Sequence, residues 1–501
     1  MADAKLGRRF AVAAWAGALA FLSGSAVAAE DKAVALVRQG LEAQGGEALL
    51  RSFGSVTFAA RGYRNMLEQS ERPEGPWLVE FLALKETHDS AHSGLKRTLE
   101  TTAPPNSVFT QELLVRDGVA MRGKDARAMP GSVKDVQAAH ETLALSPERV
   151  LLTALAAPDL HGEGDVVLYA MAQHVVGFML DGASVKVYLS AATHLPTAVD
   201  YSGPLAHGGY GSFLGDVVQQ THYSFWRRDR SGLRYPMQWD LQLNGMPDRV
   251  YMLQSLQVEE DGALAAESIP APVVQAYRKA APAPGPAPKE AVTLAPGVVL
   301  LPGAWNVGVV DQGDGLVILD APISSAYSVQ VLEQAARLFP GRKVKALVTT
   351  SDAWPHLAGI REYVARGIAV YALDRNAPIL ERTLGASYAS RPDTLQRQPK
   401  QASMTLVSGR TVIGAGANRL ELYPLRGATL ERQMMAYLPG QRLLYGSDAF
   451  QVQGSDYFLP QVVDELVQAV DRERLDVQRV FLMHVGAMPF ADLRKVPGSA
   501  D

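Results

Sequence analysis

A proline- and alanine-rich stretch, KAAPAPGPAPKEA at residues 279–291, divides the 501-residue chain into two long segments. Such a composition is stiff and extended, and it cannot contribute to a packed core. A chain of this length also exceeds what one ordinary hydrophobic core accommodates. The sequence therefore predicts two folded domains, residues 30–278 and 292–501, joined by a linker at 279–291.

The first 29 residues have the layout of a secretory signal peptide. MADAKLGRRF is basic, AVAAWAGALAFL is an apolar run of signal length, and SGSAVAA supplies small residues for cleavage near Ala28 or Ala29. The alternative is a short membrane anchor, but the run is too short to span comfortably and no later run reaches transmembrane length. We expect a Sec-type signal peptide over residues 1–29 and export, most simply to a bacterial periplasm.

The amino-acid composition limits which binding partners and which kinds of metal site the chain can have. The net charge of −4 gives no reason to expect binding to nucleic acid or to an anionic membrane. The chain contains no cysteine, which excludes disulfides, thiolate metal ligands and the lipid-bearing cysteine of a lipoprotein. Any metal site must therefore be built from His, Asp or Glu.

The segment before the linker alternates polar and apolar residues in many short runs. Examples are SVTFAARGY, WLVEFLALKETH and DVVLYAMAQHVVGFML, and Asp-Gly or Asn-Gly pairs separate several of the runs. This pattern predicts antiparallel hairpins with one buried face. Helical patterns at AVALVRQGLEAQGGEALLRSF and SPERVLLTALA would pack on that face, giving a curved sheet or half-barrel with helices. In addition, VKVYLSAATHLPTAVDYS resembles the LolA-like lipoprotein-carrier half-barrels, in which a strand ends at a similar TxLP turn.

The segment after the linker mixes strands with amphipathic helices. GVVLLPG, WNVGVVDQGDGLVILDAP and SMTLVSG read as strands, and short buried strands such as VKALVTT, IAVYAL, RLLYGSD and RVFLMHVG follow. SAYSVQVLEQAARLF, HLAGIREYVARG and LPQVVDELVQAVDRERL carry apolar residues at helical spacing. This order predicts packed sheets with helices outside, so the whole chain is of mixed α+β and α/β class.

Three residues of this second segment stand where strand ends usually place functional side chains. His356 follows VKALVTT, Asp448 ends RLLYGSD, and His484 lies in RVFLMHVG. Strand ends share one rim of a sheet, so these side chains are candidates to face one another. Two imidazoles and a carboxylate can hold Zn²⁺ or Fe²⁺, which lowers the pKa of a bound water. The alternative is that the histidines are structural and that Asp448 only caps a turn.

The order of these segments resembles the metallo-β-lactamase superfamily over residues 292–495, and most closely its exported members with an unrelated N-terminal domain. The resemblance implies an αββα sandwich with a one- or two-metal site on the rim between its sheets. The first metal motif of the family, HxHxDH, falls on residues 351–356. Ser351, Ala353 and Pro355 stand at three ligand positions of that motif, and only His356 is kept.

The remaining family positions continue this degenerate pattern. The next family histidine falls on Ala428 or Thr429, depending on the register, and is also lost. Asp448 matches the metal-bridging aspartate and His484 the last histidine. The resemblance therefore implies at most one zinc or iron ion, held weakly and at low occupancy by His356, Asp448 and His484.

The motif loop is also expected to be reshaped. Pro355 removes a backbone N–H and should hold Trp354 in an extended conformation. The Trp-Pro pair would then fill the former cleft with apolar surface. Asp352 stands at a variable position of the motif and should point elsewhere.

Other candidate sites are weaker. HDSAH places His88 and His92 four residues apart, a metal-binding spacing in a helix, but the segment reads as a turn. The loop SGPLAHGGYGSFLG lacks the helix pattern of a phosphate-binding site, and no Ser/His/Asp set stands out.

The sequence thus leaves two functions open. One is an exported hydrolase-like protein with weak or altered one-metal activity. The other is a non-catalytic pseudoenzyme that uses the half-barrel and the former cleft to bind a small or apolar ligand or a partner. The sequence assigns no catalytic residue, and His356, Asp448 and His484 are candidate metal ligands only.

Overall fold

The computed structural model describes residues 32–67, 74–103, 107–204, 214–280, 286–449, 451–453, 456–458 and 460–496. The predicted signal peptide at 1–29 and the centre of the predicted linker lie outside these residues. Among the residues described, no helix is long and apolar enough to cross a membrane.

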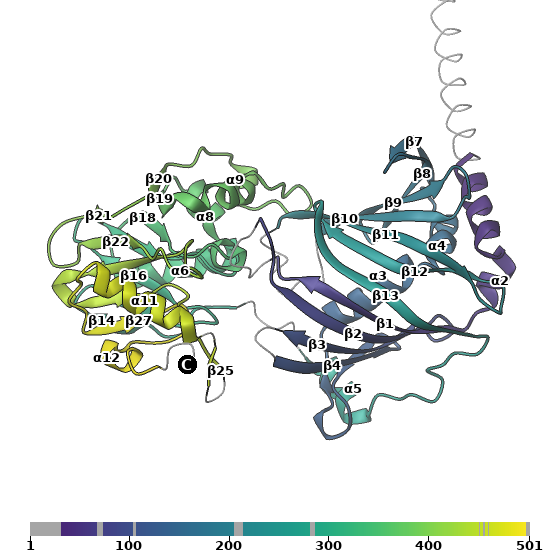
Figure 1. The fold of residues 1–501 in the computed structure, drawn as a ribbon, viewed down its shortest axis with the longest axis horizontal. Coiled ribbons are helices and arrows are strands. Elements are labelled where there is room, and N and C mark those ends of the chain that lie inside the picture. The colour runs from purple at the N-terminus through teal and green to yellow at the C-terminus, as the bar shows by residue number, and fades with distance from the viewer. Residues whose placement is uncertain are drawn as a thin grey trace, which may run out of the picture.

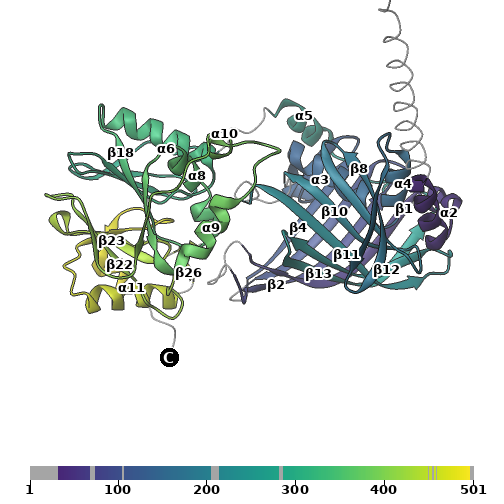
Figure 2. The same ribbon diagram turned by 90° about the horizontal axis from the view of Figure 1, so that it is seen from above.

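The residues before the linker form one antiparallel sheet of 13 strands, which Figures 1 and 2 show as strongly curved. Its order is β6-β5-β4-β3-β2-β1-β13-β12-β11-β10-β9-β8-β7. The strands are β1 (Ser55–Asn65), β2 (Val79–Asp89), β3 (Gly94–Ala103), β4 (Ser107–Arg116), β5 (Val119–Arg122), β6 (Met129–Pro130), β7 (His161–Leu168), β8 (Met171–Leu180), β9 (Ala183–Ser190), β10 (Pro196–Pro204), β11 (Asp216–Arg228), β12 (Arg234–Leu243) and β13 (Met246–Glu259).

Sequence alternation explains this sheet. In β9, buried and half-buried residues alternate along the whole strand. Asp181-Gly182 connects β8 to β9 and Asn244-Gly245 connects β12 to β13, all four residues with positive φ. Positive φ at both central residues is what tight hairpin turns require, so these Asp-Gly and Asn-Gly pairs act as the pattern predicted.

Most of the helices cover one face of this sheet, and the last of them packs on Leu114 and Met121 of the other face. They are a helix over residues 32–44, α2 (Glu47–Ser52), α3 (Val133–Leu145), α4 (Val150–Ala156) and α5 (Ala271–Lys279), with the 3₁₀ turn η1 (Asp125–Arg127). The first helix and α4 share a hydrophobic cluster with the sheet residues Phe58, Trp239 and Tyr251. Helix α3, which hydrophobic periodicity did not predict, packs on β3, β4 and β5.

The residues after the linker form two larger sheets and one small hairpin. The first sheet, in the order β14 to β20, is antiparallel up to β17 and parallel from there, and the second has the order β21-β22-β23-β24-β27-β28. The strands are β14 (Val292–Ala295), β15 (Val298–Leu301), β16 (Val307–Asp311), β17 (Leu316–Leu319), β18 (Val344–Thr349), β19 (Ala369–Leu373), β20 (Met404–Val407), β21 (Thr411–Ile413), β22 (Leu420–Pro424), β23 (Met434–Leu438), β24 (Leu443–Tyr445), β25 (Gln451–Gln453), β26 (Asp456–Phe458), β27 (Arg479–Phe481) and β28 (Met488–Pro489).

The hydrophobic clusters show how these elements are layered. One cluster joins Val317 and Val348 of the first sheet to Leu422 and Phe481 of the second, so the two sheets face each other. A second cluster places helices on the outer side of the first sheet, and a third places α11 outside the second. The helices are α6 (Ser325–Leu338), α7 (Trp354–Leu357), α8 (Ile360–Ala365), α9 (Ala377–Gly385), α10 (Thr394–Arg397), α11 (Pro460–Arg472) and α12 (Phe490–Leu493), with the 3₁₀ turns η3 (Asp374–Asn376) and η4 (Pro439–Gln441). The mixed α/β class with large antiparallel sheets agrees with the sequence prediction.

Candidate metal centre

The structure brings His356, Asp448 and His484 together. His356 lies in α7, just after β18, whereas Asp448 and His484 follow β24 and β27. Because β24 and β27 are parallel neighbours, their ends lie at the same edge of the second sheet. Across the described ranges, these three residues form the one group of three or more potential ligands, with ligating atoms all within 4.8 Å of one another.

Asp448 is the centre of this group. Its Oδ1 lies 2.9 Å from His484 Nε2, and its Oδ2 lies 3.7 Å from His356 Nδ1. The indole of Trp305 contacts both imidazoles, with ring centroids 5.9 Å from His356 and 6.1 Å from His484. Trp305 therefore packs on the site from the β15–β16 loop, a contact that sequence reasoning missed because nothing local marks the residue.

His356 is buried and electrically neutral at physiological pH. Burial outweighs the attraction of Asp448 and lowers the pKa of His356 to about 4. Its Nδ1 lies 2.8 Å from the hydroxyl of Ser351. One ring nitrogen of the neutral imidazole keeps a lone pair, and neutral imidazole is the form that binds metal ions. Ser351, which stands where the resembling motif has a histidine, thus contacts His356 and orients its ring.

A buried hydrogen-bond network lies next to the group. Asp320, directly after β17, accepts hydrogen bonds of 2.6 Å each from the backbone N–H of Thr350, the Thr350 hydroxyl and the Tyr445 hydroxyl. The Ser447 hydroxyl donates to the carbonyl of Thr350. Burial raises the pKa of Asp320 to about 6, and the charge of Asp448 adds to the rise. The network ties the strand ends of the two sheets together beside Asp448.

Sequence reasoning missed this network, although a signal existed. Asp320 ends the apolar run GLVILD just as Asp448 ends RLLYGSD. Asp448 was predicted as a candidate because it is a polar residue at the end of a buried strand. Asp320 has the same position in its own strand, so the same criterion predicts Asp320 as well.

Asp352 lies outside the group of three, in line with the expectation that it points elsewhere. Its Oδ2 is 4.0 Å from the Nε of Arg432. Burial raises the pKa of Asp352 to about 8, although Arg432 opposes the rise. Asp352 is therefore a buried neighbour of Arg432 rather than a replacement ligand.

The prediction for Trp354 was wrong. Trp354 is the first residue of α7, and the extended residue is Ala353, with φ −66° and ψ 131°. Pro355 is accommodated as the second residue of the helix because no N–H is needed in a first turn. The Trp354 ring packs in the helix-covered cluster of the first sheet, beneath Arg382, so it fills core rather than an open cleft.

A backbone anchor holds the loop around residues 428 and 429, where the resemblance placed a further histidine. The N–H groups of Thr429 and Leu430 donate to the carboxylate of Glu465 on α11, at 2.9 and 2.8 Å. A Cβ at Gly427 would stand 1.9 Å from the same carboxylate. The 427–430 loop is thus held against α11 and contributes no side chain to the group of three.

The weaker HDSAH candidate does not form a shared site. His88 lies in β2, not in a turn, and is buried between the carboxylates of Glu86 and Glu148 at 2.8 and 2.7 Å. Burial alone would lower the pKa of His88, but Glu148 and Glu86 outweigh it and raise the pKa to about 10. His92 instead lies against Asp89, at 3.1 Å. Each histidine thus has its own carboxylate partners.

The comparisons with known proteins show that this chain is similar in fold to solved structures. No protein-family model and no curated protein matches the chain. Among solved structures, the DIM-1 metallo-β-lactamase is 17% identical, with a TM-score of 0.33, and the match covers 41% of this chain and 94% of that one. A metallo-β-lactamase from Hirschia baltica is 16% identical over 42% of this chain and 96% of that one, with a TM-score of 0.32.

A third solved structure is an alkylsulfatase. The inverting sec-alkylsulfatase Pisa1 from Pseudomonas sp. is 13% identical, with a TM-score of 0.31, and the match covers 41% of this chain and 39% of that one. The solved structures that are similar to this chain thus include metallo-β-lactamases, the family that the sequence motifs resemble.

Proposed function

We propose that the protein is an exported hydrolase of the metallo-β-lactamase fold whose site holds a single zinc or iron ion, weakly, through His356, Asp448 and His484. The supporting observation is the convergence of three ligand-type side chains within 4.8 Å, from three separate strand ends. The proposal includes the domain division made above: a signal peptide at 1–29, a half-barrel domain at 30–278, a linker at 279–291 and an αββα domain at 292–501.

The donor set fits one cation. Two imidazoles and one carboxylate, with further positions left for water or substrate, are a ligand set typical of catalytic zinc sites. A second ion lacks donors, because Ser351, Ala353 and Pro355 supply none of the lost ligands. A bound cation would supply Lewis acidity, which polarises the bond to be hydrolysed and favours hydroxide over water.

The chain's own residues then orient the site. His484 Nε2 lies 2.9 Å from Asp448 Oδ1, and the Ser351 hydroxyl lies 2.8 Å from His356 Nδ1, so both imidazoles are held beside Asp448. Trp305 lies against both rings and limits the access of water from its side. Asp448 is 14% exposed and His484 23%, so a substrate approaches from their side, where Asp448 can accept a proton.

Metal analysis of the purified mature protein tests this proposal. We expect up to one zinc or iron ion per chain after reconstitution, and its loss in His484→Ala. A His161→Ala variant is the matched control, because His161 lies on the exposed edge strand β7. A protein that takes up no metal, with a melting temperature unaffected by added zinc or chelator, would contradict the enzymatic function.

The second candidate is a non-catalytic binding protein, and a cavity favours it. A cavity of about 700 Å³ lies between the covered face of the 13-stranded sheet and helices α3 and α4, with mostly apolar walls. This volume is within the range of small-molecule sites. In this function the half-barrel binds an apolar ligand. The group of His356, Asp448 and His484 is then a remnant of an ancestral site and has no catalytic role. The metal-free outcome described above would favour this candidate.

A further inference from the structure

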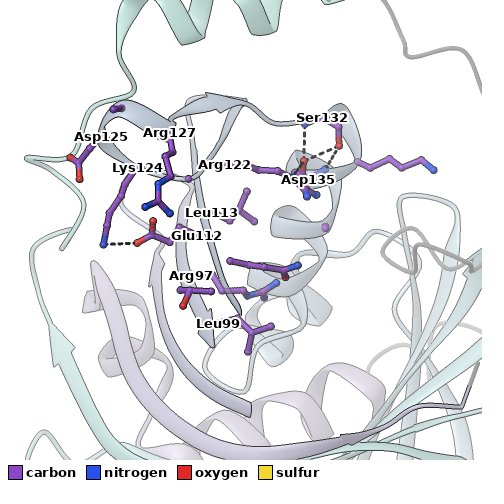
Figure 3. A pocket seen from close by; sticks show the side chains of 16 residues that line it. Arg97, Leu99, Glu112, Leu113, Arg122, Lys124, Asp125, Arg127, Ser132 and Asp135 are labelled. Atoms are coloured by element: carbon purple, nitrogen blue, oxygen red, sulfur yellow. Dashed lines mark hydrogen bonds and ion pairs between the residues drawn. The ribbon is translucent and has the colours of Figure 1, made fainter. Parts of the chain in front are cut away.

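A second cavity of the 13-stranded sheet is larger and more polar. Its volume is about 960 Å³, and its walls come from β3, β4, the loop around η1 and the first turns of α3 (Figure 3). Five of the side chains that line it are basic and three are acidic: Arg97, Arg122, Lys124, Arg127 and Lys134 against Glu112, Asp125 and Asp135. The lining thus has an excess of two positive charges in a chain whose net charge is −4.

Arg97 is held rigidly in this wall. Its Nε donates to Glu86, whose other oxygen lies 2.8 Å from the protonated ring of His88. Within the described chain, the two Nη groups of Arg97 make no hydrogen bond, and the side chain is 33% exposed. One edge of the guanidinium is therefore anchored, while its remaining donors are available to a ligand.

Two further arginines stand around the same cavity. Arg122 pairs with Asp135 through Nε and Nη2, at 3.1 and 2.5 Å. Arg127, in η1, is exposed, and its side chain has no hydrogen bond or ion pair with any residue that the structure describes. Lys124 is neutralised by Glu112 at 2.9 Å. The cationic groups not paired with a carboxylate of the lining are thus those of Arg97, Arg127 and Lys134.

We propose that this cavity binds an organic anion, whose carboxylate, phosphate or sulfonate group is held by Arg97 and Arg127 and whose body lies against Leu99 and Leu113. Guanidinium groups match such oxyanions in geometry and bind them with charge-assisted hydrogen bonds. The volume is that of a site for a whole organic molecule, far more than inorganic phosphate fills. The site lies in the 13-stranded sheet and is separate from the metal centre, so it does not depend on the proposed hydrolase activity.

Fluorescence titration of the full chain with 8-anilinonaphthalene-1-sulfonate tests the site. We expect Arg127→Gln and Arg97→Gln to weaken binding of this anionic probe at least tenfold. Arg61→Gln is the matched control, because Arg61 is an exposed residue of β1 and its loss removes the same charge from the sheet without touching the cavity. The neutral probe N-phenyl-1-naphthylamine should bind all variants equally, since it needs no arginine.

Competition identifies the anionic group. Decanoate, decyl phosphate and decanesulfonate should displace the probe in an order that shows which oxyanion the arginines prefer, whereas decanol should not. An unchanged affinity of the anionic probe in Arg127→Gln would overturn the proposal, and so would equal displacement by decanol. Arg127 is exposed, so Arg127→Gln should fold. The test therefore stands even if Arg97→Gln, which removes one of the two partners of Glu86, does not fold.

Discussion

At the scale of single residues, two buried histidines show how neighbours decide charge. Burial disfavours the imidazolium of both His356 and His88. His88 lies between two carboxylates and stays protonated, whereas His356 faces Asp448 at 3.7 Å and a serine hydroxyl and stays neutral. The sequence offered His356, Asp448 and His484 as candidates to face one another, because strand ends share a rim. It could not predict that Glu148 is a partner of His88, since Glu148 lies 60 residues away.

The hydrogen bond from Tyr445 to Asp320 gives a pH-dependent prediction. The pKa of Asp320 in the folded chain, about 6, lies above its ordinary value of 3.8. Asp320 is therefore ionised at pH 8 and mostly protonated at pH 5, and hydrogen bonds to charged groups are the stronger ones. Tyr445→Phe should lower the free energy of unfolding by about 2 kcal/mol at pH 8 and by about 1 kcal/mol or less at pH 5.

Urea denaturation at the two pH values measures this difference. Tyr437→Phe is the matched control, because the Tyr437 hydroxyl donates to the uncharged backbone carbonyl of Asp476, at 2.8 Å. Its cost should be the same at pH 5 and pH 8. An equal cost of Tyr445→Phe at both values would show that Asp320 does not change its charge in this range.

At the scale of elements, the periodicity of hydrophobic residues predicted most strands and most of the long helices. It did not predict α3. Only a few residues of α3 are buried, among them Ala139, so its apolar stripe is weak. The missed signal was the start of the helix. Ser132 accepts from the N–H of Asp135, whose carboxylate accepts from the N–H of Ser132 in return. This reciprocal cap satisfies two free N–H groups, and it was overlooked because Asp takes the place of the usual Glu.

Removing that cap should loosen the first turn of α3. Ser132→Ala should cost about 1 kcal/mol locally, because the N–H of Asp135 loses its acceptor. Hydrogen–deuterium exchange of the peptide over residues 133–145 should then be about fivefold faster in its first turn. Ser255→Ala, a change at an exposed serine of β13, should leave this exchange rate as it is. Unchanged exchange in Ser132→Ala would mean that packing on β3 to β5, rather than the cap, holds the helix end.

At the scale of the whole molecule, the sequence predicted two domains but not the contacts between the two segments of the chain. Asp216, at the start of β11, accepts hydrogen bonds from the Ser387 hydroxyl and from the backbone N–H of Ser390, at 2.7 and 3.1 Å. Arg432 donates to Glu74, 358 residues away in the sequence. Such pairs leave no mark in periodicity or local composition, because each partner alone reads as an ordinary polar residue.

The pair of Glu74 and Arg432 links this contact to the candidate site. Arg432 is only 7% exposed, and besides Glu74 it donates to Asn376 and to the carbonyl of Arg375. Its neighbour Gln433 accepts a hydrogen bond from the backbone N–H of Asp448, at 3.3 Å. A displacement of Arg432 would therefore reach a proposed metal ligand through a single residue.

Removing the charge of Glu74 should weaken both the contact and the site. Burial alone would raise the pKa of Glu74, but Arg432 outweighs it and lowers the pKa, so the stabilisation is present above the ordinary value of 4.5 and is lost on acidification. Glu74→Gln leaves the guanidinium of Arg432 without its main partner, and we expect a cost of about 2 kcal/mol at pH 7, less than for a fully buried pair because Glu74 is 33% exposed. Scanning calorimetry should show a lower melting temperature at pH 7 and a smaller difference from the unmodified chain at pH 4.

Glu47→Gln is the control, because it breaks only the exposed pair with Arg51 on α2 and should cost less than about 0.5 kcal/mol. Equal thermograms for Glu74→Gln and Glu47→Gln would show that the contact between Glu74 and Arg432 contributes nothing to stability.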